Sequence, residues 1–230
     1  EIGGIWFDGE WDQFKWDGKR FGEPMADFKL AEVYSLIHKL QPQALIGSNH
    51  HLAPNPGEDF QMFEKDLPGR STKSFATSAD DIGNLPLEVC ETINGSWGFN
   101  LKDRKHKSKK ELVQYLIKAA GYDSNLLLNV GPMPNGKIQK EHIKSLKEIG
   151  DWIKVNGETI YGTIRGPIDP TDEIASTQKD NTIYIHLLDN RKTYFIEGYN
   201  PKIKKISYYH SNKKVKYQKT KSGLIINVDD

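Results

Sequence analysis

The stretch Ile2-Gly3-Gly4-Ile5-Trp6-Phe7-Asp8-Gly9-Glu10 places acidic residues directly after a short apolar run. Such a run is typical of a strand buried in a parallel sheet. Three later runs have the same character, and amphipathic helical patterns lie between them. These runs are Ala44–Gly47, Leu87–Cys90 and Leu126–Val130. The alternation predicts an α/β domain over residues 1–165, built from β-α units around a parallel sheet.

Three helices are expected between and after these strands. The first has apolar residues at helical spacing from Leu30 to Leu40, with Asp27 as a candidate cap and Pro42 near its end. Ser108-Lys109-Lys110-Glu111 forms a capping box for the second, because the serine and glutamate side chains can each satisfy a backbone amide of the other. The third carries apolar residues from Ile143 to Ile153 and ends near Gly157.

Polar residues follow the predicted strands at their carboxyl ends. They are Asp8-Gly9-Glu10, Asn49-His50-His51, Glu91-Thr92, and Asn129 with Gly131-Pro132. In a parallel α/β barrel, that end of the strands holds the active site. Four strands are too few to close such a barrel. We therefore expect the C-terminal half of a TIM-like barrel, whose other half was removed or is carried by another polypeptide.

The pattern changes after Gly166-Pro167 to short β-rich runs separated by Asn, Gly and Pro. The runs are Thr182–Leu188, Thr193–Glu197, Lys204–Tyr209 and Leu224–Val228. Their spacing predicts a small antiparallel β-sandwich domain over residues 166–230. Nothing in this region resembles a catalytic constellation.

Charge and composition exclude several functional classes. The 230 residues carry 32 Lys and Arg against 31 Asp and Glu, and this near balance gives no reason to expect nucleic acid or a membrane as a partner. No stretch approaches the roughly 20 apolar residues of a membrane helix. The single cysteine, Cys90, excludes an internal disulfide, and its apolar neighbours predict a buried, inert thiol.

Carboxylates provide the candidate chemistry. Asp8 lies among aromatic rings at a strand end, which suits a sugar, although it could equally cap a turn. The long segment Pro56–Gly69 contains Glu58, Asp59, Glu64 and Asp66, and it has no strong helical or strand pattern. Long connections of this kind are often functional. For each of these acids, solvation or capping is the competing interpretation.

A further acidic pair and one aromatic residue also fit a sugar site. Glu88 and Glu91 lie in an apolar run, so each needs a partner or a raised pKa. Trp97 stands between two glycines, as a sugar platform would. The histidines lack the spacing of a zinc helix, and the sequence has no phosphate loop, dinucleotide fingerprint or serine-nucleophile elbow. We therefore expect no metal and no cofactor.

Together these motifs resemble the α-L-fucosidases of glycoside hydrolase family 29, and most closely their Bacteroidetes-type members. The motifs that carry the resemblance are Trp6-Phe7-Asp8-Gly9-Glu10-Trp11, Leu87-Glu88-Val89-Cys90-Glu91-Thr92, Ser96-Trp97-Gly98-Phe99-Asn100 and Asn125-Leu126-Leu127-Leu128-Asn129-Val130-Gly131-Pro132. The resemblance runs along the whole chain. Family members have about as much catalytic domain again before the first motif.

The resemblance implies roles for individual residues. Asp8 matches the nucleophile of a retaining mechanism, and Trp6 matches a residue that lines the fucose pocket. The acid/base maps onto Glu64 through Asp59-Phe60-Gln61-Met62-Phe63-Glu64, while other alignments select Glu58 or Glu88.

The resemblance also implies substrate contacts, partners and a location. Trp97 matches an aromatic residue at the sugar pocket, and His50 falls near a position where some members use an arginine against the substrate. Glu58 is a further candidate substrate contact. The implied partners are a fucosylated glycan and the missing N-terminal half of the barrel, and the implied location is periplasmic or secreted. The alternatives are another barrel glycosidase, such as an α-galactosidase, or a non-catalytic carbohydrate-binding fragment.

Overall fold

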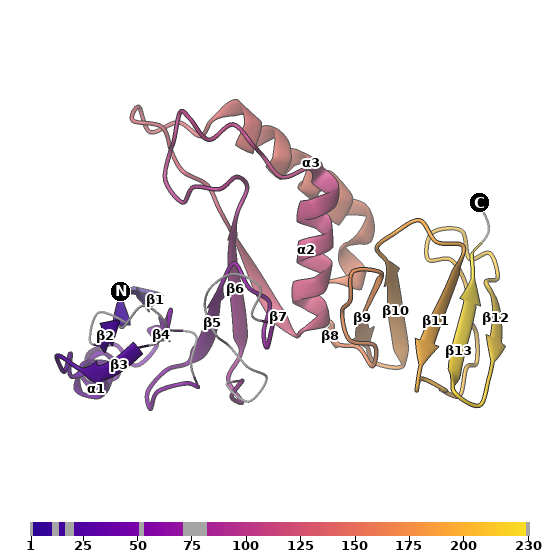
Figure 1. Ribbon diagram of the computed structural model, residues 1–230, viewed down its shortest axis with the longest axis horizontal. Helices are drawn as coiled ribbons and strands as arrows, with labels where there is room; N and C mark the ends of the chain where they lie inside the picture. The colour runs from indigo at the N-terminus through magenta and orange to yellow at the C-terminus, as the bar shows by residue number, and fades with distance from the viewer. Residues whose placement is uncertain (1, 11–13, 17–20, 51–52, 71–81, 229–230) are drawn as a thin grey trace. The chain divides into compact units, whose positions relative to one another are not determined.

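The computed structural model describes residues 2–10, 14–16, 21–50, 53–70 and 82–228 of the chain. The chain divides into two compact units, Glu1–Gly157 and Glu158–Asp230. Figure 1 shows α2 beside β7 and α3 beside α2 in the first unit, and it labels only strands in the second.

A five-stranded parallel sheet forms the first unit, in the order β1-β4-β5-β6-β7. The strands are β1 Gly4–Phe7, β4 Leu45–Ser48, β5 Phe60–Glu64, β6 Leu87–Thr92 and β7 Ser124–Asn129. Every neighbouring pair is parallel. The sheet and the β-strands of the second unit confirm the predicted fold class, a partial barrel followed by a small β domain.

The strand β5 corrects the prediction of a patternless connection. Phe60-Gln61-Met62-Phe63-Glu64 has no alternation of polar and apolar residues, because Gln61, Met62 and Phe63 are all buried. The Gln61 side chain accepts a hydrogen bond from the Gly83 amide at 3.0 Å, which allows a polar residue on a buried face. Because β5 is buried on both faces, its sequence lacks the alternation by which a strand is recognised.

Helices follow the strands as predicted. They are α1 Leu30–Leu40, α2 Lys109–Gly121 and α3 Lys140–Asn156, followed by the 3-10 turn Gly157–Thr159. The capping box of Ser108 and Glu111 is present at the start of α2. Asp27 does not cap α1: it lies three residues before Leu30, the first residue of the helix, and its carboxylate accepts from the Lys29 amide at 2.8 Å. A separate hairpin pairs β2 Phe14–Trp16 with β3 Phe21–Pro24.

The two faces of the parallel sheet differ in burial. On one face, Phe63 and Val89 pack against Ala119 of α2, and the ring of Phe7 lies 5.1 Å from that of Tyr34 on α1. The opposite face exposes three large apolar side chains, Trp6, Leu45 and Leu127. An apolar face open to solvent is what the inner wall of half a barrel would present.

A close approach on this inner face explains one glycine. A Cβ at residue 47 would lie 2.4 Å from the Phe60 ring. Gly47 therefore allows that ring to cross β4.

Two three-stranded antiparallel sheets form the second unit, in the orders β10-β9-β8 and β11-β13-β12. Their strands are β8 Ile164–Arg165, β9 Ile174–Lys179, β10 Thr182–Leu187, β11 Thr193–Glu197, β12 Lys216–Lys219 and β13 Gly223–Asn227. Apolar residues from both sheets meet in one core that includes Ile174, Ile196 and Ile226. This arrangement is the predicted antiparallel sandwich.

One strand prediction in the second unit was wrong. Lys204–Tyr209 forms no strand, and only Ser207 makes an isolated bridge, with Lys214. Ile203 and Ile206 nevertheless pack against the core of the sandwich. The apolar spacing therefore predicted the burial of these residues correctly. A strand, however, also needs a neighbouring strand for its backbone hydrogen bonds.

Two smaller findings concern membranes and the thiol. None of the helices in the described residues is long and apolar enough to cross a bilayer. Cys90 is buried as predicted, and burial raises the pKa of its thiol to about 12, so the nucleophilic thiolate is strongly disfavoured.

Candidate active site

The turn after β1 carries the first candidate carboxylate. Asp8 directly follows the strand and is exposed. Gly9 has φ of 82°, a conformation that suits glycine and lets the chain turn sharply beyond the carboxylate. The amide of Asn49 donates to the carbonyl of Phe7 at 2.9 Å, so the ends of β1 and β4 stay in register beside Asp8.

Asn49 links two of the predicted residues. Its Nδ2 donates to Asp8 Oδ1 at 3.2 Å and to Glu64 Oε2 at 2.8 Å, and the asparagine is completely buried. Because one nitrogen contacts both carboxylates, the two oxygens lie at most about 6 Å apart, the sum of these distances. Carboxyl groups at about 5–5.5 Å suit a retaining glycosidase, whereas inverting enzymes need about 6.5–9.5 Å.

Trp97 contacts the same glutamate from the other side. Its Nε1 donates to Glu64 Oε1 at 3.0 Å, and the residue is 37% exposed. The Lys65 ammonium lies 4.7 Å from the centre of the Trp97 ring and donates to the carbonyl of Gly95 at 3.2 Å. The asparagine and the indole therefore hold one oxygen each of Glu64.

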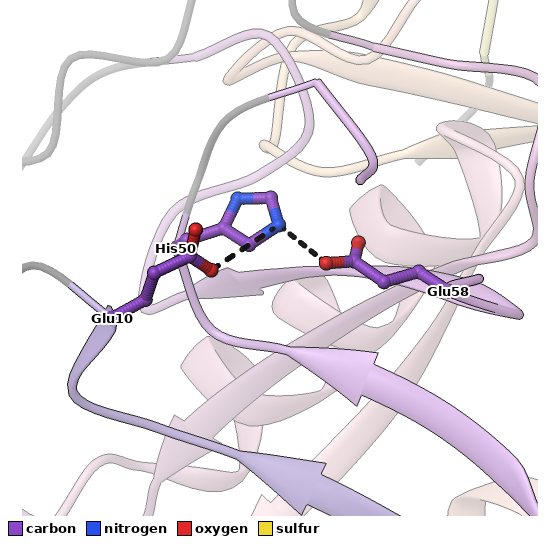
Figure 2. Close-up of side chains that lie close together, drawn as sticks. All are labelled: Glu10, His50 and Glu58. Atoms are coloured by element: carbon purple, nitrogen blue, oxygen red, sulfur yellow. Dashed lines mark hydrogen bonds and ion pairs between the residues drawn. The ribbon is translucent and has the colours of Figure 1, made fainter. Parts of the chain in front are cut away.

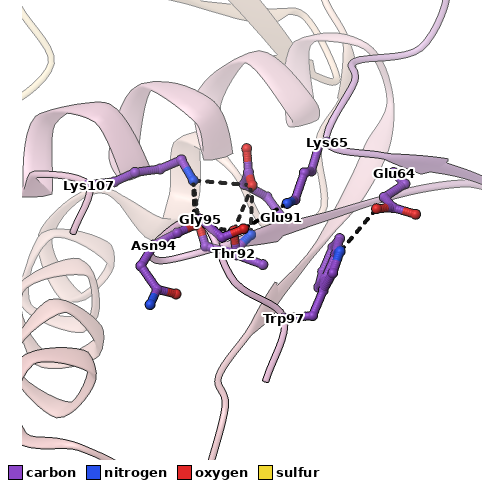
Figure 3. A network of polar contacts seen from close by, with 8 residues as sticks. All are labelled: Glu64, Lys65, Glu91, Thr92, Asn94, Gly95, Trp97 and Lys107. Carbon is purple, nitrogen blue, oxygen red and sulfur yellow. Dashed lines mark hydrogen bonds and ion pairs between the residues drawn. The ribbon is translucent and has the colours of Figure 1, made fainter. Parts of the chain in front are cut away.

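An ion pair between the buried Glu91 and the partly buried Lys107 holds the loop that carries Trp97, as Figure 3 shows. Lys107 Nζ lies 3.2 Å from Glu91 Oε1 and donates to the carbonyl of Thr92 at 2.6 Å. The same glutamate oxygen accepts from the Thr92 amide at 2.7 Å, and the Thr92 hydroxyl donates to the carbonyl of Asn94. These contacts tie the end of β6 to the start of the loop, which fixes where Trp97 can lie.

Glu88 and Trp6 lie lower on the same inner face. The register pairs Glu64 with Cys90 and Met62 with Glu88, so Glu88 lies two residues further from the strand ends than Glu64 does. Burial raises the pKa of Glu88, and a hydrogen bond with the Trp6 side chain opposes that rise. Trp6 is 42% exposed on this face. Glu88 therefore lies beside an exposed indole.

A second carboxylate cluster, which we call the His50 cluster, comprises Glu10, His50 and Glu58 (Figure 2). His50 Nε2 lies 2.8 Å from Glu58 Oε1 and 3.9 Å from Glu10 Oε2. The side chains of His50 and Glu58 are only 3% and 0% exposed. Burial opposes the charged imidazole, but the hydrogen bond to Glu58 and the two negative charges outweigh it and raise the pKa of His50.

The same three residues form the group that could hold a metal ion in the described part of the chain. One ligand atom from each lies within 4.8 Å of the others. Two carboxylates and an imidazole are suitable donors for a divalent transition metal. The short contact between His50 and Glu58 is equally that of an ordinary hydrogen bond.

The structure thus divides the predicted site residues into three groups. Asp8, Glu64 and Trp97 come together, Trp6 lies beside Glu88, and His50 lies with Glu58 in the His50 cluster. His51, also noted in the sequence, lies outside the described residues.

Asn49 was not singled out from the sequence, although its place at a strand end was noted. Its bridging contacts depend on the register of β1, β4 and β5, which no local pattern reveals. Lys65 and Lys107 were likewise missed.

A family model for alpha-L-fucosidase matches residues 1–158 of the chain. The chain belongs to the α-L-fucosidase family. This match confirms the resemblance found in the sequence. The chain is therefore related to glycoside hydrolases.

Curated relatives match with modest identity and partial coverage. Plasma alpha-L-fucosidase of Homo sapiens is 30% identical over 161 residues, which are 58% of this chain and 34% of the relative. Alpha-L-fucosidase of Branchiostoma floridae is 26% identical over 207 residues, or 77% of this chain and 45% of the relative. The chain therefore spans less than half the length of these fucosidases.

Solved fucosidase structures share the fold. Alpha-L-fucosidase isoenzyme 1 from Paenibacillus thiaminolyticus matches with a TM-score of 0.74 and 29% identity, covering 100% of this chain and 54% of that one. The Thermotoga maritima α-fucosidase in complex with a mechanism-based inhibitor matches with a TM-score of 0.67 and 23% identity, covering 87% and 45%. Both units of this chain therefore have counterparts within a known fucosidase structure.

Proposed function

We propose that this chain provides the two catalytic carboxylates of a retaining α-L-fucosidase, which removes terminal α-L-fucose from glycans. The contact of Asn49 with both Asp8 and Glu64 carries the proposal, because it keeps one oxygen of each carboxylate within about 6 Å of the other, which is less than the roughly 6.5–9.5 Å of an inverting enzyme. Membership of the fucosidase family supports the choice of sugar.

Asp8 acts as the nucleophile in this proposal. It is exposed at the strand end, and its second oxygen is free of the bond from Asn49 to Oδ1. Attack on the anomeric carbon forms a bond from that carbon to an Asp8 oxygen and breaks the bond to the leaving oxygen. Glu64 gives its proton to the leaving oxygen in the same step. The product of this half-reaction is a covalent fucosyl-enzyme.

Water completes the cycle. Its oxygen attacks the anomeric carbon while Glu64 accepts one of its protons, and the bond to Asp8 breaks. Fucose leaves with its original anomeric configuration, because two displacements each invert the carbon. The contacts from Asn49 and Trp97 orient the Glu64 carboxyl group toward the leaving oxygen.

The two exposed indoles provide the sugar platform. Trp6 and Trp97 lie on the inner face and at the strand ends, near the proposed carboxylates. Aromatic faces pack well against the apolar C–H face of a sugar. One of the related structures, that of the Thermotoga maritima α-fucosidase, is a complex with fucose.

Activity requires a second half of the barrel. Five strands are described in the parallel sheet, with β1 and β7 at its edges, whereas a closed barrel has about eight. The exposed inner residues Leu45 and Leu127 need apolar neighbours from those further strands. We propose that the complementary half, on the same or a second polypeptide, completes the barrel. We call the result the assembled barrel.

Hydrolysis by the assembled barrel tests the proposed function. We expect it to cleave an aryl α-L-fucoside, and ¹H NMR should detect α-L-fucose as the first product. Cleavage of only the aryl α-galactoside would show a different glycosidase, and β-L-fucose as the first product would exclude the retaining route. Fucose binding without turnover, unchanged by Asp8→Ala, would show a carbohydrate-binding fragment instead.

A further inference from the structure

Three consecutive residues at the end of β4 contact acidic groups on both faces of the sheet. Asn49 points to the inner face, where it contacts the proposed catalytic carboxylates. Ser48 and His50 both contact the carboxylate of Glu10, the former donating its hydroxyl at 3.2 Å. Successive side chains of a strand point to opposite faces, so the His50 cluster lies behind the site.

The contacts of the His50 cluster join two segments that are distant in the sequence. Glu10 accepts from Ser48 and from Asn55 Nδ2, the latter at 3.2 Å and 3.4 Å to its two oxygens. Asn55 also donates to Glu58 Oε1 at 3.3 Å, and the same oxygen contacts His50. The cluster therefore ties the turn after β1 to the connection that enters β5.

Burial separates the cluster from the sugar. His50 and Glu58 are almost wholly covered although no second half of the barrel lies over the inner face. Any added strands can only reduce that exposure. Tyr34 of α1 is completely buried, and burial, with a smaller contribution from the charges of Glu58 and Glu10, raises its pKa to about 12. A sugar on the inner face cannot reach these side chains.

We propose that Glu10, His50 and Glu58 are positioning residues, which hold the turn that carries Asp8 at a fixed place relative to Asn49 and Glu64. The proposal rests on the proposed function, and it assigns His50 and Glu58 neither to the sugar nor to proton transfer. Glu10 lies two residues after Asp8, with the sharp turn at Gly9 between them. The hydrogen bonds of Glu10 thus hold the turn after β1 in one conformation, although Gly9 by itself would allow several.

Loss of the contacts of the His50 cluster should slow the chemical step. A displacement of about 1 Å in a reacting group can lower a rate by about 100-fold. Binding of fucose should change little, because the cluster does not touch the sugar. A positioning role thus predicts a lower kcat with nearly constant KM.

Three variants of the assembled barrel test the proposal with an aryl α-L-fucoside. We expect His50→Phe, which removes the polar contacts, to lower kcat by about 100-fold and to change KM by less than about 3-fold. His50→Gln places an amide nitrogen near the position of Nε2, so it should restore kcat to within about 10-fold of the unsubstituted protein. The matched control is His38→Phe.

His38 provides a suitable control because it forms the other histidine–carboxylate pair of the same connection. Its Nε2 lies 2.9 Å from Asp59 Oδ2, but this pair joins α1 to β5 and is about one third exposed. We expect His38→Phe to change kcat by less than about 3-fold. An equal loss of kcat in both phenylalanine variants would show general loosening and would overturn the proposal.

Further outcomes separate the proposal from its competitors. A rise in KM with unchanged kcat in His50→Phe would make His50 a sugar contact. Stoichiometric Zn²⁺ binding by calorimetry, lost in His50→Phe, would make the cluster a metal site. If His50→Phe does not fold, Glu10→Gln replaces it and should show the same lowered kcat. Inactivity of the unsubstituted assembled barrel would instead refute the proposed function, since these comparisons are ratios to its activity.

Discussion

Two carboxylate pairs lie close together at the end of β4, and consecutive residues join them. Asn49 joins Asp8 to Glu64 on the inner face, while in the His50 cluster an imidazole joins two further glutamates behind that face. The first pair includes an exposed carboxylate, and the second is nearly sealed. Proximity of two acids therefore does not identify a catalytic pair; access to the substrate does.

The largest effect should follow from removing the proposed nucleophile. Asp8→Gly should lower kcat by at least about 10⁴-fold, since no covalent intermediate can form. Added azide should then restore cleavage of an activated aryl α-L-fucoside and give β-L-fucosyl azide, because only one displacement occurs. An α-azide, or full activity of the variant, would place the nucleophile elsewhere.

Loss of the acid/base should have the next largest effect. Glu64→Ala should lower kcat/KM by about 10²–10⁴-fold for a poor leaving group and far less for an activated one, because kcat/KM reports the first step and an activated leaving group needs no proton there. Azide should here yield the α-fucosyl azide, since attack follows formation of the fucosyl-enzyme.

Glu58→Gln and Glu88→Gln sharpen the assignment of the acid/base. Neither should show this dependence on the leaving group: Glu58 is sealed behind the site, and Glu88 lies lower on the inner face, beside Trp6. The same dependence in either variant would move the acid/base to that residue.

The indole contact to Glu64 should have a smaller effect. Trp97→Phe keeps an aromatic platform but removes the donor to Glu64 Oε1. Loss of one hydrogen bond to a carboxyl group costs about 1–3 kcal/mol, which predicts a fall in kcat/KM of about 5–150-fold. Steady-state kinetics will measure the fall in kcat/KM. Lys65→Met tests whether removal of the adjacent ammonium lowers kcat/KM by less than Trp97→Phe does.

The smallest effect concerns stability and pH. The raised pKa of His50 means that the folded state binds this proton more tightly than the unfolded state does. Its contribution is complete below the ordinary value of 6.5 and is lost as the pH rises through the higher folded value. Thermal melts between pH 5 and 9 should show this loss, and His50→Gln should abolish it. If the melting temperature instead fell as the pH was lowered, and His50→Gln removed that fall, the raised pKa of His50 would be contradicted.

The sequence predicted those elements whose signals are local. The capping box at Ser108 needs only four residues, and four of the five parallel strands carry short apolar runs. The strand β5 was not predicted, because it is buried on both faces and its sequence lacks alternation of polar and apolar residues. Lys204–Tyr209 had the apolar spacing of a strand but lacks a paired neighbour over most of its length.

The candidate site was predictable in part for the same reason. Asp8 stood out at a strand end, and the family resemblance selected Glu64. Their connection through Asn49 depends on three strands coming into register across more than forty residues, which no single segment encodes. The buried place of His50 also follows from that register, so the sequence alone could not place this histidine beside Glu58.

Covalent trapping tests the central claim most directly. The assembled barrel would be treated with a 2-deoxy-2-fluoro-fucosyl donor that has an activated leaving group, digested, and analysed by mass spectrometry. Our account predicts one fucosyl adduct, on the carboxylate of Asp8. An adduct on Glu58, Glu64 or Glu88, or turnover of fucosides without any adduct and with inversion, would contradict it.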